Sequence, residues 1–235
     1  MKQLGILFIC IAALVSVQAH AAGGDDPLLF SGAFEQFEMQ QHGAEKPIAW
    51  NGSFWVGKDL HKVYLKTEGE MVDGAIEDME LQLLYSKAVS PYWDMQFGLR
   101  QDTHPAVTRN YLAFGYMGVA PYFIESDVGL FYDVDTGQSS FRLDAEYEMM
   151  ITQRLVLIPE LEMNVFGQND ALTRTGSGLA NMSFGLRLAY EIRREFAPYV
   201  GVNWSQKFGQ TASYAIADGK DASGTQLVAG VRFWF

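Results

Sequence analysis

Acidic side chains recur at every second position in several stretches, a spacing that places them on one face of an extended strand. Asp144 and Glu146 stand two residues apart, as do Glu160 and Glu162. A row of carboxylates can concentrate cations or, with arginine nearby, form a hydrogen-bonded scaffold. The candidate residues for this chemistry are Asp127, Asp144, Glu146, Glu160, Arg187, Glu68 and Glu80.

A few side chains with softer donor atoms offer a second kind of chemistry. Met39 precedes His42 by three positions, and the alternation places Met150 on the same face as the carboxylates. A thioether with an imidazole suits copper, particularly reduced copper. Met39, His42 and Met150 are therefore candidate metal ligands. Met39 and His42 would lie near the same rim of the barrel, although two ligands make a poor metal site.

The net charge of the chain and the absence of known catalytic motifs exclude several classes of function. The formal net charge of −11 argues against nucleic-acid binding and suits cationic partners, including metal ions. A Ser-His-Asp arrangement with recognisable spacing, an HExxH motif and a phosphate-binding loop are all absent from the sequence. We therefore predict that the protein is not an enzyme.

The first residues have the pattern of a secretory signal peptide. Lys2 precedes an apolar run from Leu4 to Val17, and Ala19-His20-Ala21 is a small-x-small cleavage triplet. Cleavage after Ala21 would remove Cys10, which excludes disulfides and thiolate sites from the mature chain. The predicted organisation is a signal peptide over 1–21, a short lead over 22–32 and a barrel over 33–235.

Apolar and polar residues alternate along almost the whole mature chain, which is typical of strands that face two different environments. The expected strands are about 9 to 14 residues long, the length that tilted membrane strands need. The sequence predicts an all-β fold, a transmembrane up-and-down antiparallel barrel of twelve strands. The alternative is ten strands, with the first two forming an N-terminal arm. The expected strands are 33–41, 50–57, 61–70, 77–89, 92–102, 109–117, 122–133, 139–151, 153–166, 180–193, 197–208 and 225–235.

The connections between these strands alternate between short and long. Outer-membrane barrels have short periplasmic turns and longer outer loops, and the expected termini fall on the short-turn side. We therefore predict a bacterial outer-membrane protein with both termini in the periplasm, whose last strand ends at Phe235 and pairs with the first. The longer connections are expected at 42–49, 71–76, 103–108, 134–138, 167–179 and 209–224.

If the apolar phase faces lipid, the acidic phase faces the lumen. Counting from the strand ends puts Asp127, Asp144, Glu146, Glu160 and Arg187 at similar depth, where adjacent strands can bring them into one charged wall. Glu68 and Glu80 would line the same lumen. Two interpretations stay open: a structural network that holds the barrel in shape, and a cation-selective lumen or weak metal site.

Several long strings resemble the copper resistance protein B family of outer-membrane proteins. They are KVYLKTEGE (62–70), ELQLLYSKAVSPYWDMQFGLRQD (80–102), RNYLAFGYMGVAPYFIE (109–125), AEYEMMITQRLVLIPELEMN (145–164), YEIRREFAPYVGVNWSQKFGQTA (190–212) and TQLVAGVRFWF (225–235). The resemblance covers nearly all of the mature chain. It implies an outer-membrane barrel of copper tolerance, with copper as a transient ligand and not a catalytic cofactor.

Many family members carry a long segment rich in His and Met ahead of the barrel, and this sequence departs from that pattern. Between Ala22 and Phe30 it has AGGDDPLLF, with neither residue type. A copper role must therefore rest on the barrel, its lumen carboxylates or the few Met and His residues near its rims.

Three functional hypotheses follow: copper binding or passage at the outer membrane, a general cation-preferring narrow porin, and a structural or lipid-modifying barrel. The expected partners are copper ions, outer-membrane lipid and the barrel-assembly machinery, with periplasmic copper proteins as further candidates and no nucleic acid.

Overall fold

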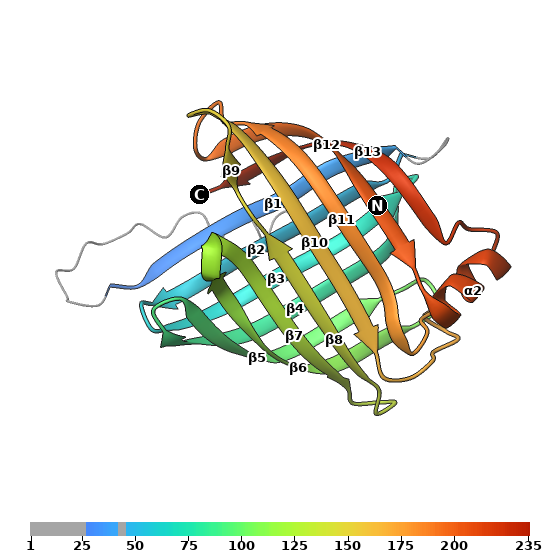
Figure 1. Ribbon diagram of the computed structural model, residues 1–235. Coiled ribbons are helices and arrows are strands. Elements are labelled where there is room, and N and C mark those ends of the chain that lie inside the picture. The colour runs from blue at the N-terminus through green and yellow to red at the C-terminus, as the bar shows by residue number, and fades with distance from the viewer. Residues whose placement is uncertain (1–26, 42–45) are drawn as a thin grey trace.

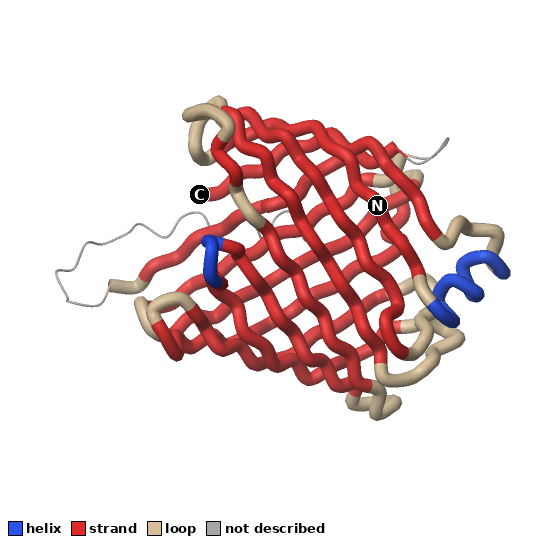
Figure 2. The backbone as a smooth tube through the Cα atoms, in the orientation of Figure 1, coloured by secondary structure: helices blue, strands red, loops and turns tan. Residues whose placement is uncertain are grey.

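The computed structural model describes residues 27–41 and 46–235. The predicted signal peptide and His42 lie outside these residues. The described chain forms one antiparallel sheet that closes into a barrel with strongly tilted strands (Figures 1 and 2). None of its helices is long and apolar enough to cross a membrane.

Each of the twelve predicted strands is present. They are β1 (Leu29–Gln41), β2 (Ile48–Lys58), β3 (His61–Val72), β4 (Ala75–Ser90), β5 (Trp93–Thr103), β6 (Thr108–Ala120), β7 (Ile124–Asp133), β8 (Ser139–Glu146) with β9 (Met149–Met150), β10 (Leu155–Phe166), β11 (Gly178–Tyr190), β12 (Phe196–Lys207) and β13 (Ser223–Trp234). β1 begins four residues before its predicted start. It pairs with both β2 and β13, so the ten-strand alternative is wrong.

The eighth predicted strand is interrupted between β8 and β9, although both pieces pair with β10. Pro159 of β10 lies opposite the interruption and accepts a hydrogen bond from the Tyr147 backbone at 3.1 Å. Proline has no backbone N–H to return a second bond, so the ladder is incomplete at this point. β8 and β9 therefore act as one strand of the barrel.

The end of the chain closes the barrel, as predicted. Phe235 and Gly32 exchange backbone hydrogen bonds of 2.9 and 3.0 Å. The Phe235 ring also lies 6.3 Å from the ring of Phe54 on β2. Closure leaves no free edge, which is the condition for strands to span a membrane.

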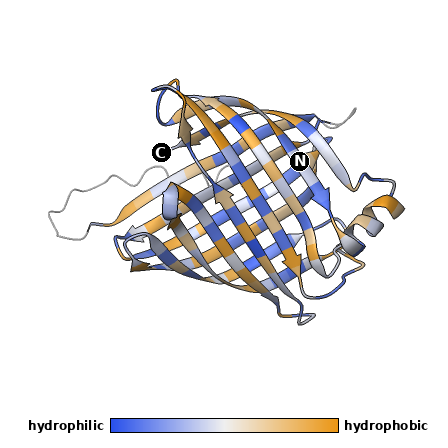
Figure 3. Cartoon of the chain, in the orientation of Figure 1, coloured by the Kyte–Doolittle hydropathy of each residue, from blue (hydrophilic) through white to orange (hydrophobic). Residues whose placement is uncertain are grey.

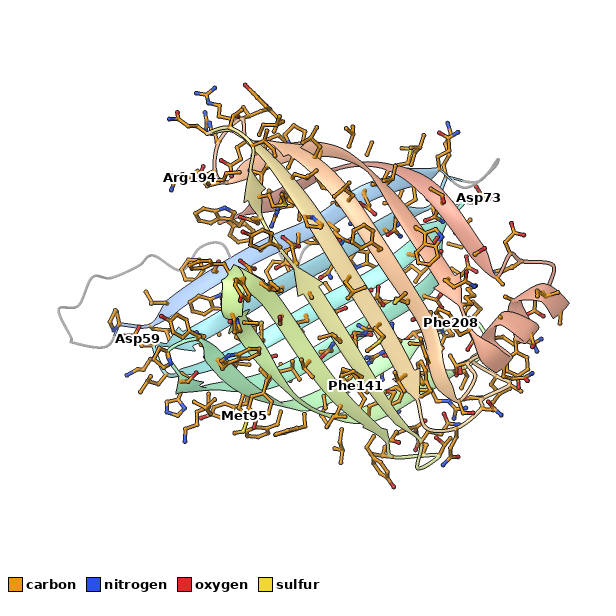
Figure 4. All side chains as sticks on the ribbon, viewed as in Figure 1. Asp59, Asp73, Met95, Phe141, Arg194 and Phe208 are labelled. Carbon is orange, nitrogen blue, oxygen red and sulfur yellow. The ribbon has the colours of Figure 1, made fainter. Side chains whose placement is uncertain are left out.

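The two ends of the barrel differ in their connections. The short-turn end carries the connections at 59–60, 91–92, 151–154 and 191–195, together with η2 (Pro121–Phe123). The loop end carries the connections at 73–74, 104–107, 134–138, 167–177 and 208–222, of which only the last two are longer than those at the short-turn end. The connection after β12 contains the helix α2 (Gly209–Ala217), which the sequence analysis did not predict. In Figure 4, Asp59, Met95 and Arg194 mark the short-turn end, and Asp73 and Phe208 mark the loop end.

One predicted long connection is wrong. The chain passes from β3 to β4 at the loop end through Asp73 and Gly74 alone. Both residues have positive φ, +50° and +81°, the pattern of the type I′ turn that two-residue hairpins favour. Asp-Gly is a strong signal for this turn, and it outweighs the expectation of alternating loop lengths.

Replacing Gly74 with alanine should lower the free energy of unfolding by about 1 kcal/mol, because a side chain at this positive φ is strained. A Cβ there would meet no atom within 4 Å, so the loss is conformational and not steric. Urea unfolding in lipid vesicles would measure it. Asparagine tolerates this backbone region, so Gly74→Asn should lose less; equal stability of Gly74→Ala and wild type would contradict the assignment.

Hydrophilic and hydrophobic residues alternate along the strands, as the colour bands in Figure 3 show, which is the pattern of strands with one face toward the lumen and one toward the outside. The outward face carries exposed apolar residues such as Leu83, Leu99 and Leu130. Two apolar clusters face inward. The first joins β10 to β13 and consists of Val156, Ile158, Ala189, Ala197, Tyr199 and Val228, and the second, on β3 to β7, consists of Tyr64, Leu84, Tyr111, Ala113 and Phe131.

Candidate functional site: the charged lumen

Six carboxylates stand in two rows on the lumen face of β7, β8 and β10. The first row is Glu125, Glu146 and Glu160, and the second is Asp127, Asp144 and Glu162. Cβ atoms of directly opposed residues lie about 5 Å apart, so like charges there repel unless a cation intervenes. We call these six residues the carboxylate array. The register thus brings together the four predicted acidic wall residues and adds Glu125 and Glu162.

The cations that meet the array reach it from distant strands. Lys66 of β3 bonds Asp127, four strands away in the sheet order. Arg232 of β13 lies 3.3 Å from Glu146, also four strands away. Lys66 and Arg232 were missed by the sequence analysis because nothing in their local pattern indicates a partner across the lumen.

Asp144 stands out among the array members for its lack of hydrogen bonds. No side chain in the described residues donates a hydrogen bond to its carboxylate, and the same holds for Glu125. Asp144 lines a small cavity of about 30 Å³, which is room for a few water molecules. Lys66, Asp127 and Arg142 line the same cavity.

Arg187 does not simply join the predicted wall. Its guanidinium forms two hydrogen bonds of 2.9 Å with the carboxylate of Glu38, and it also bonds Glu160. The Tyr199 hydroxyl donates to the same Glu38 carboxylate at 2.9 Å. Gln36 donates to Glu160 at 2.8 Å. Arg187 is therefore the centre of a buried network in which Glu38 is only 1% exposed.

Glu38 was missed because of a bulge in β1. The pairing of β1 with its neighbours shifts register between Phe34 and Phe37. The extra residue reverses the phase of the strand. In a straight strand Glu38 would share the outward face with Phe34; after the bulge it faces the lumen.

Glu68 and Glu80 belong to a separate network nearer the loop end. Arg142 of β8 donates to Glu68 at 3.0 Å and to Glu80 at 2.9 Å, five and four strands away. Arg100 lies 2.6 Å from Glu80 and donates to Asp102 at 2.7 Å. We call this group the Arg142 bridge, because it crosses the lumen and joins opposite walls.

The comparisons with known proteins agree on one family. The sequence model described as "Copper resistance protein B precursor (CopB)" matches residues 28–235. The chain belongs to the copper resistance protein B family. It is 39% identical to copper resistance protein B of Escherichia coli over 95% of this chain and 75% of that protein. It is 41% identical to a copper resistance protein B homolog of Pseudomonas syringae pv. tomato (strain ATCC BAA-871 / DC3000) over 86% and 68%.

Solved structures share the barrel fold at low sequence identity. The NanC porin is 13% identical with a TM-score of 0.55, and covers 87% of this chain and 99% of its own. The outer membrane phospholipase A of Escherichia coli is 12% identical with a TM-score of 0.52, over 87% and 92%. This copper resistance protein B family member is thus an outer-membrane barrel. By the rule for such barrels we expect its short-turn end to face the periplasm.

The softer candidate ligands of this family member are not gathered at one place. Met39 lies near the loop end of β1 and is 51% exposed on the outward face, whereas Met150 is 69% exposed at the short-turn end. Met117 is a second methionine in the lumen phase, with Gln96 Nε2 3.8 Å from its sulfur. The described parts of the chain hold no group of three or more His, Cys, Asp or Glu arranged to bind a metal.

The two histidines of the described ranges have protein partners. His61 bonds the Tyr85 hydroxyl, and His104 bonds Asp78 near the loop end. The bond to Asp78 raises the pKa of His104 above its ordinary value. A histidine with a raised pKa holds its proton more firmly, which works against metal coordination by the same ring.

Proposed function

We propose that this family member contributes to copper resistance by binding copper ions in the lumen of the barrel. The observation that carries the proposal is the carboxylate array, in which Asp144 and Glu125 lack a hydrogen-bonding partner among the described side chains. A divalent cation between opposed carboxylates would remove their mutual repulsion.

The donor atoms favour the oxidised ion. Thioether and thiolate ligands select reduced copper, whereas the array offers oxygen atoms. For a given set of oxygen and nitrogen ligands, Cu²⁺ binds more tightly than the other divalent ions of its row. Copper is then a ligand that the barrel holds or passes, and not a catalytic cofactor. The family supports a binding or transport protein in preference to an enzyme.

The Arg142 bridge favours binding over free diffusion. Arg142 joins β8 to β3 and β4 across the lumen, and Lys66 joins β3 to β7. A general cation-preferring porin would need a continuous open path, so these contacts give that alternative less support. Passage of copper toward a periplasmic copper protein would require the side-chain bridges to exchange partners.

Calorimetry with CuCl₂ on the purified full chain tests the site. Asp144→Asn combined with Glu125→Gln should weaken copper binding several-fold, because two carboxylates are lost while the ion pairs of Lys66, Arg187 and Arg232 are retained. The matched control is Asp135→Asn combined with Asp221→Asn, which removes two exposed loop carboxylates. Unchanged affinity in the array variant would exclude the array as the binding site.

Copper sensitivity of a deletion strain tests the role in the cell. Wild-type protein and the loop control should restore growth on copper, and the array variant should restore it less well. The array variant is a sharper choice than neutralising Asp127 or Glu160. Asp127 is the ion-pair partner of Lys66, and Glu160 is one of the two carboxylates bonded to Arg187, so those changes would also disturb the ion pairs that hold the barrel in shape. Equal rescue by all three proteins would assign the array to the scaffold.

A further inference from the structure

The connection between β10 and β11 crosses the mouth of the barrel at its loop end. Gly167 donates a backbone hydrogen bond of 2.7 Å to Ser139 at the start of β8. Three residues later, Asp170 accepts a hydrogen bond of 2.7 Å from Arg109 of β6. β6 is three strands away from β10 in the sheet order, and Arg109 shares the lumen face of β6 with Tyr111. This connection, residues 167–177, therefore passes above β8 and β7, and we call it the mouth loop.

The mouth loop has a structure of its own. The backbones of Asp170 and Thr175 exchange hydrogen bonds of 2.8 and 3.0 Å, which close a small hairpin. Beyond the hairpin, the Gly176 backbone donates to the Thr211 hydroxyl of α2 at 2.8 Å, and Figure 1 shows the loop at the same end of the barrel as this helix. A segment that is tied together in this way can move as one body.

The charged residues that meet the mouth loop are buried, although they lie at the end of the barrel. Asp133 is the last residue of β7 and is 0% exposed, and Arg109 and Asp170 are 9% and 6% exposed. Water would reach side chains at the end of a barrel strand unless another segment covered them. The mouth loop, which is bonded to Arg109, supplies part of that cover.

The contact between the mouth loop and the wall is incompletely satisfied. Within residues 27–41 and 46–235, Arg109 Nε and Asp133 Oδ2 are buried atoms without a hydrogen-bond partner. They lie 3.8 Å apart, which is too far for a hydrogen bond. Buried polar atoms without a partner favour arrangements in which water reaches them. The closed loop thus combines one strong ion pair, Arg109 with Asp170, and two atoms that opening would hydrate.

We propose that the mouth loop is a lid over the loop end of the lumen, held shut by the ion pair of Arg109 with Asp170, and that it opens as one body when this pair breaks. The strands beneath it include β7, β8 and β10, which carry the carboxylate array. The lid therefore controls access to the array from the loop end. This role concerns access alone, so it holds whether or not the array binds copper.

Thiol labelling of the purified protein in lipid vesicles measures the opening. The only cysteine in the sequence is Cys10, within the predicted signal peptide, so a single introduced thiol can be followed. Ser140→Cys places that thiol on the lumen face of β8, below the lid. Adding Asp170→Asn should speed labelling by a cationic methanethiosulfonate reagent about tenfold or more, because a charge-assisted hydrogen bond that holds the lid shut is weakened.

The matched control adds Asp135→Asn to Ser140→Cys, which removes an exposed carboxylate from the neighbouring loop at 134–138. It should label at the rate of Ser140→Cys alone. The proposal is overturned if Asp170→Asn does not speed labelling, or if the control speeds it equally.

Hydrogen exchange followed by mass spectrometry locates the change in the same variants. Asp170→Asn should speed amide exchange within 167–177 and leave β6, β8 and β10 at the wild-type rate. Faster exchange in those strands would overturn the proposal, because the ion pair would then hold the wall and not a lid. Heat-modifiable gel migration verifies that each variant is folded.

Discussion

Replacing Arg187 with methionine should lower the free energy of unfolding by about 3–5 kcal/mol, because it leaves a buried carboxylate without its counter-charge. The Glu38 side chain is fully buried and receives two hydrogen bonds from Arg187. Tyr199 and Gln40 still donate to Glu38, but as neutral groups they cannot balance that charge, and Glu160 would lose its ion pair with Arg187 as well. Urea unfolding in lipid vesicles, followed by tryptophan fluorescence, gives the measurement.

The double variant Arg187→Met with Glu38→Gln separates charge from packing. It should recover much of the lost stability, because the removal of both charges also removes their desolvation cost. A single Glu38→Gln change should cost less than Arg187→Met, since Arg187 keeps Glu160. If Arg187→Met unfolds at the wild-type urea concentration, the network is not a source of stability.

Replacing Arg142 with alanine should raise the cation conductance of the barrel several-fold in planar bilayers. Arg142 holds Glu68 and Glu80 from the opposite wall, and its loss removes the contact that crosses the lumen there. The two carboxylates would then line a wider path, and a ring of carboxylates favours cations over anions. Measuring the reversal potential in a salt gradient gives the selectivity.

Arg174→Ala is the matched control for this experiment. Arg174 is an exposed arginine of the loop after β10, and its ion pair with Asp218 lies outside the lumen. Its removal should leave the conductance unchanged. Arg142→Lys should give an intermediate result, because lysine keeps the charge but lacks the forked donors that serve two carboxylates. The same conductance in Arg142→Ala and Arg174→Ala would show that the bridge does not close the lumen.

The barrel could be predicted because the sequence features that determine it lie within single strands. A membrane strand must be about ten residues long and alternate between lipid and lumen, and both properties are visible in a single segment such as 180–193. Closure by the last strand follows from the same rule. The tight turn at Asp73-Gly74 was misjudged because a general expectation about loop lengths was placed above a strong local signal.

The candidate site was predictable only in part. Asp144, Glu146 and Glu160 could be placed on one wall because their strands are consecutive in the chain and their phase is regular. Glu38 could not, because a single bulged residue reverses the face on which it lies. Its importance to the Arg187 network follows from that reversal.

Pairings across the lumen come from the closed barrel alone. Arg142 and Glu68 are 74 positions apart in the chain and five strands apart in the sheet, yet their side chains lie 3.0 Å apart. Alternation along a strand states which side a residue faces, but the diameter of the barrel, the tilt of its strands and the register of each pair set the depth at which two inward side chains meet. The sequence was therefore sufficient to predict the strands that form the barrel wall. The tertiary structure was needed to identify the ion pairs that cross the lumen.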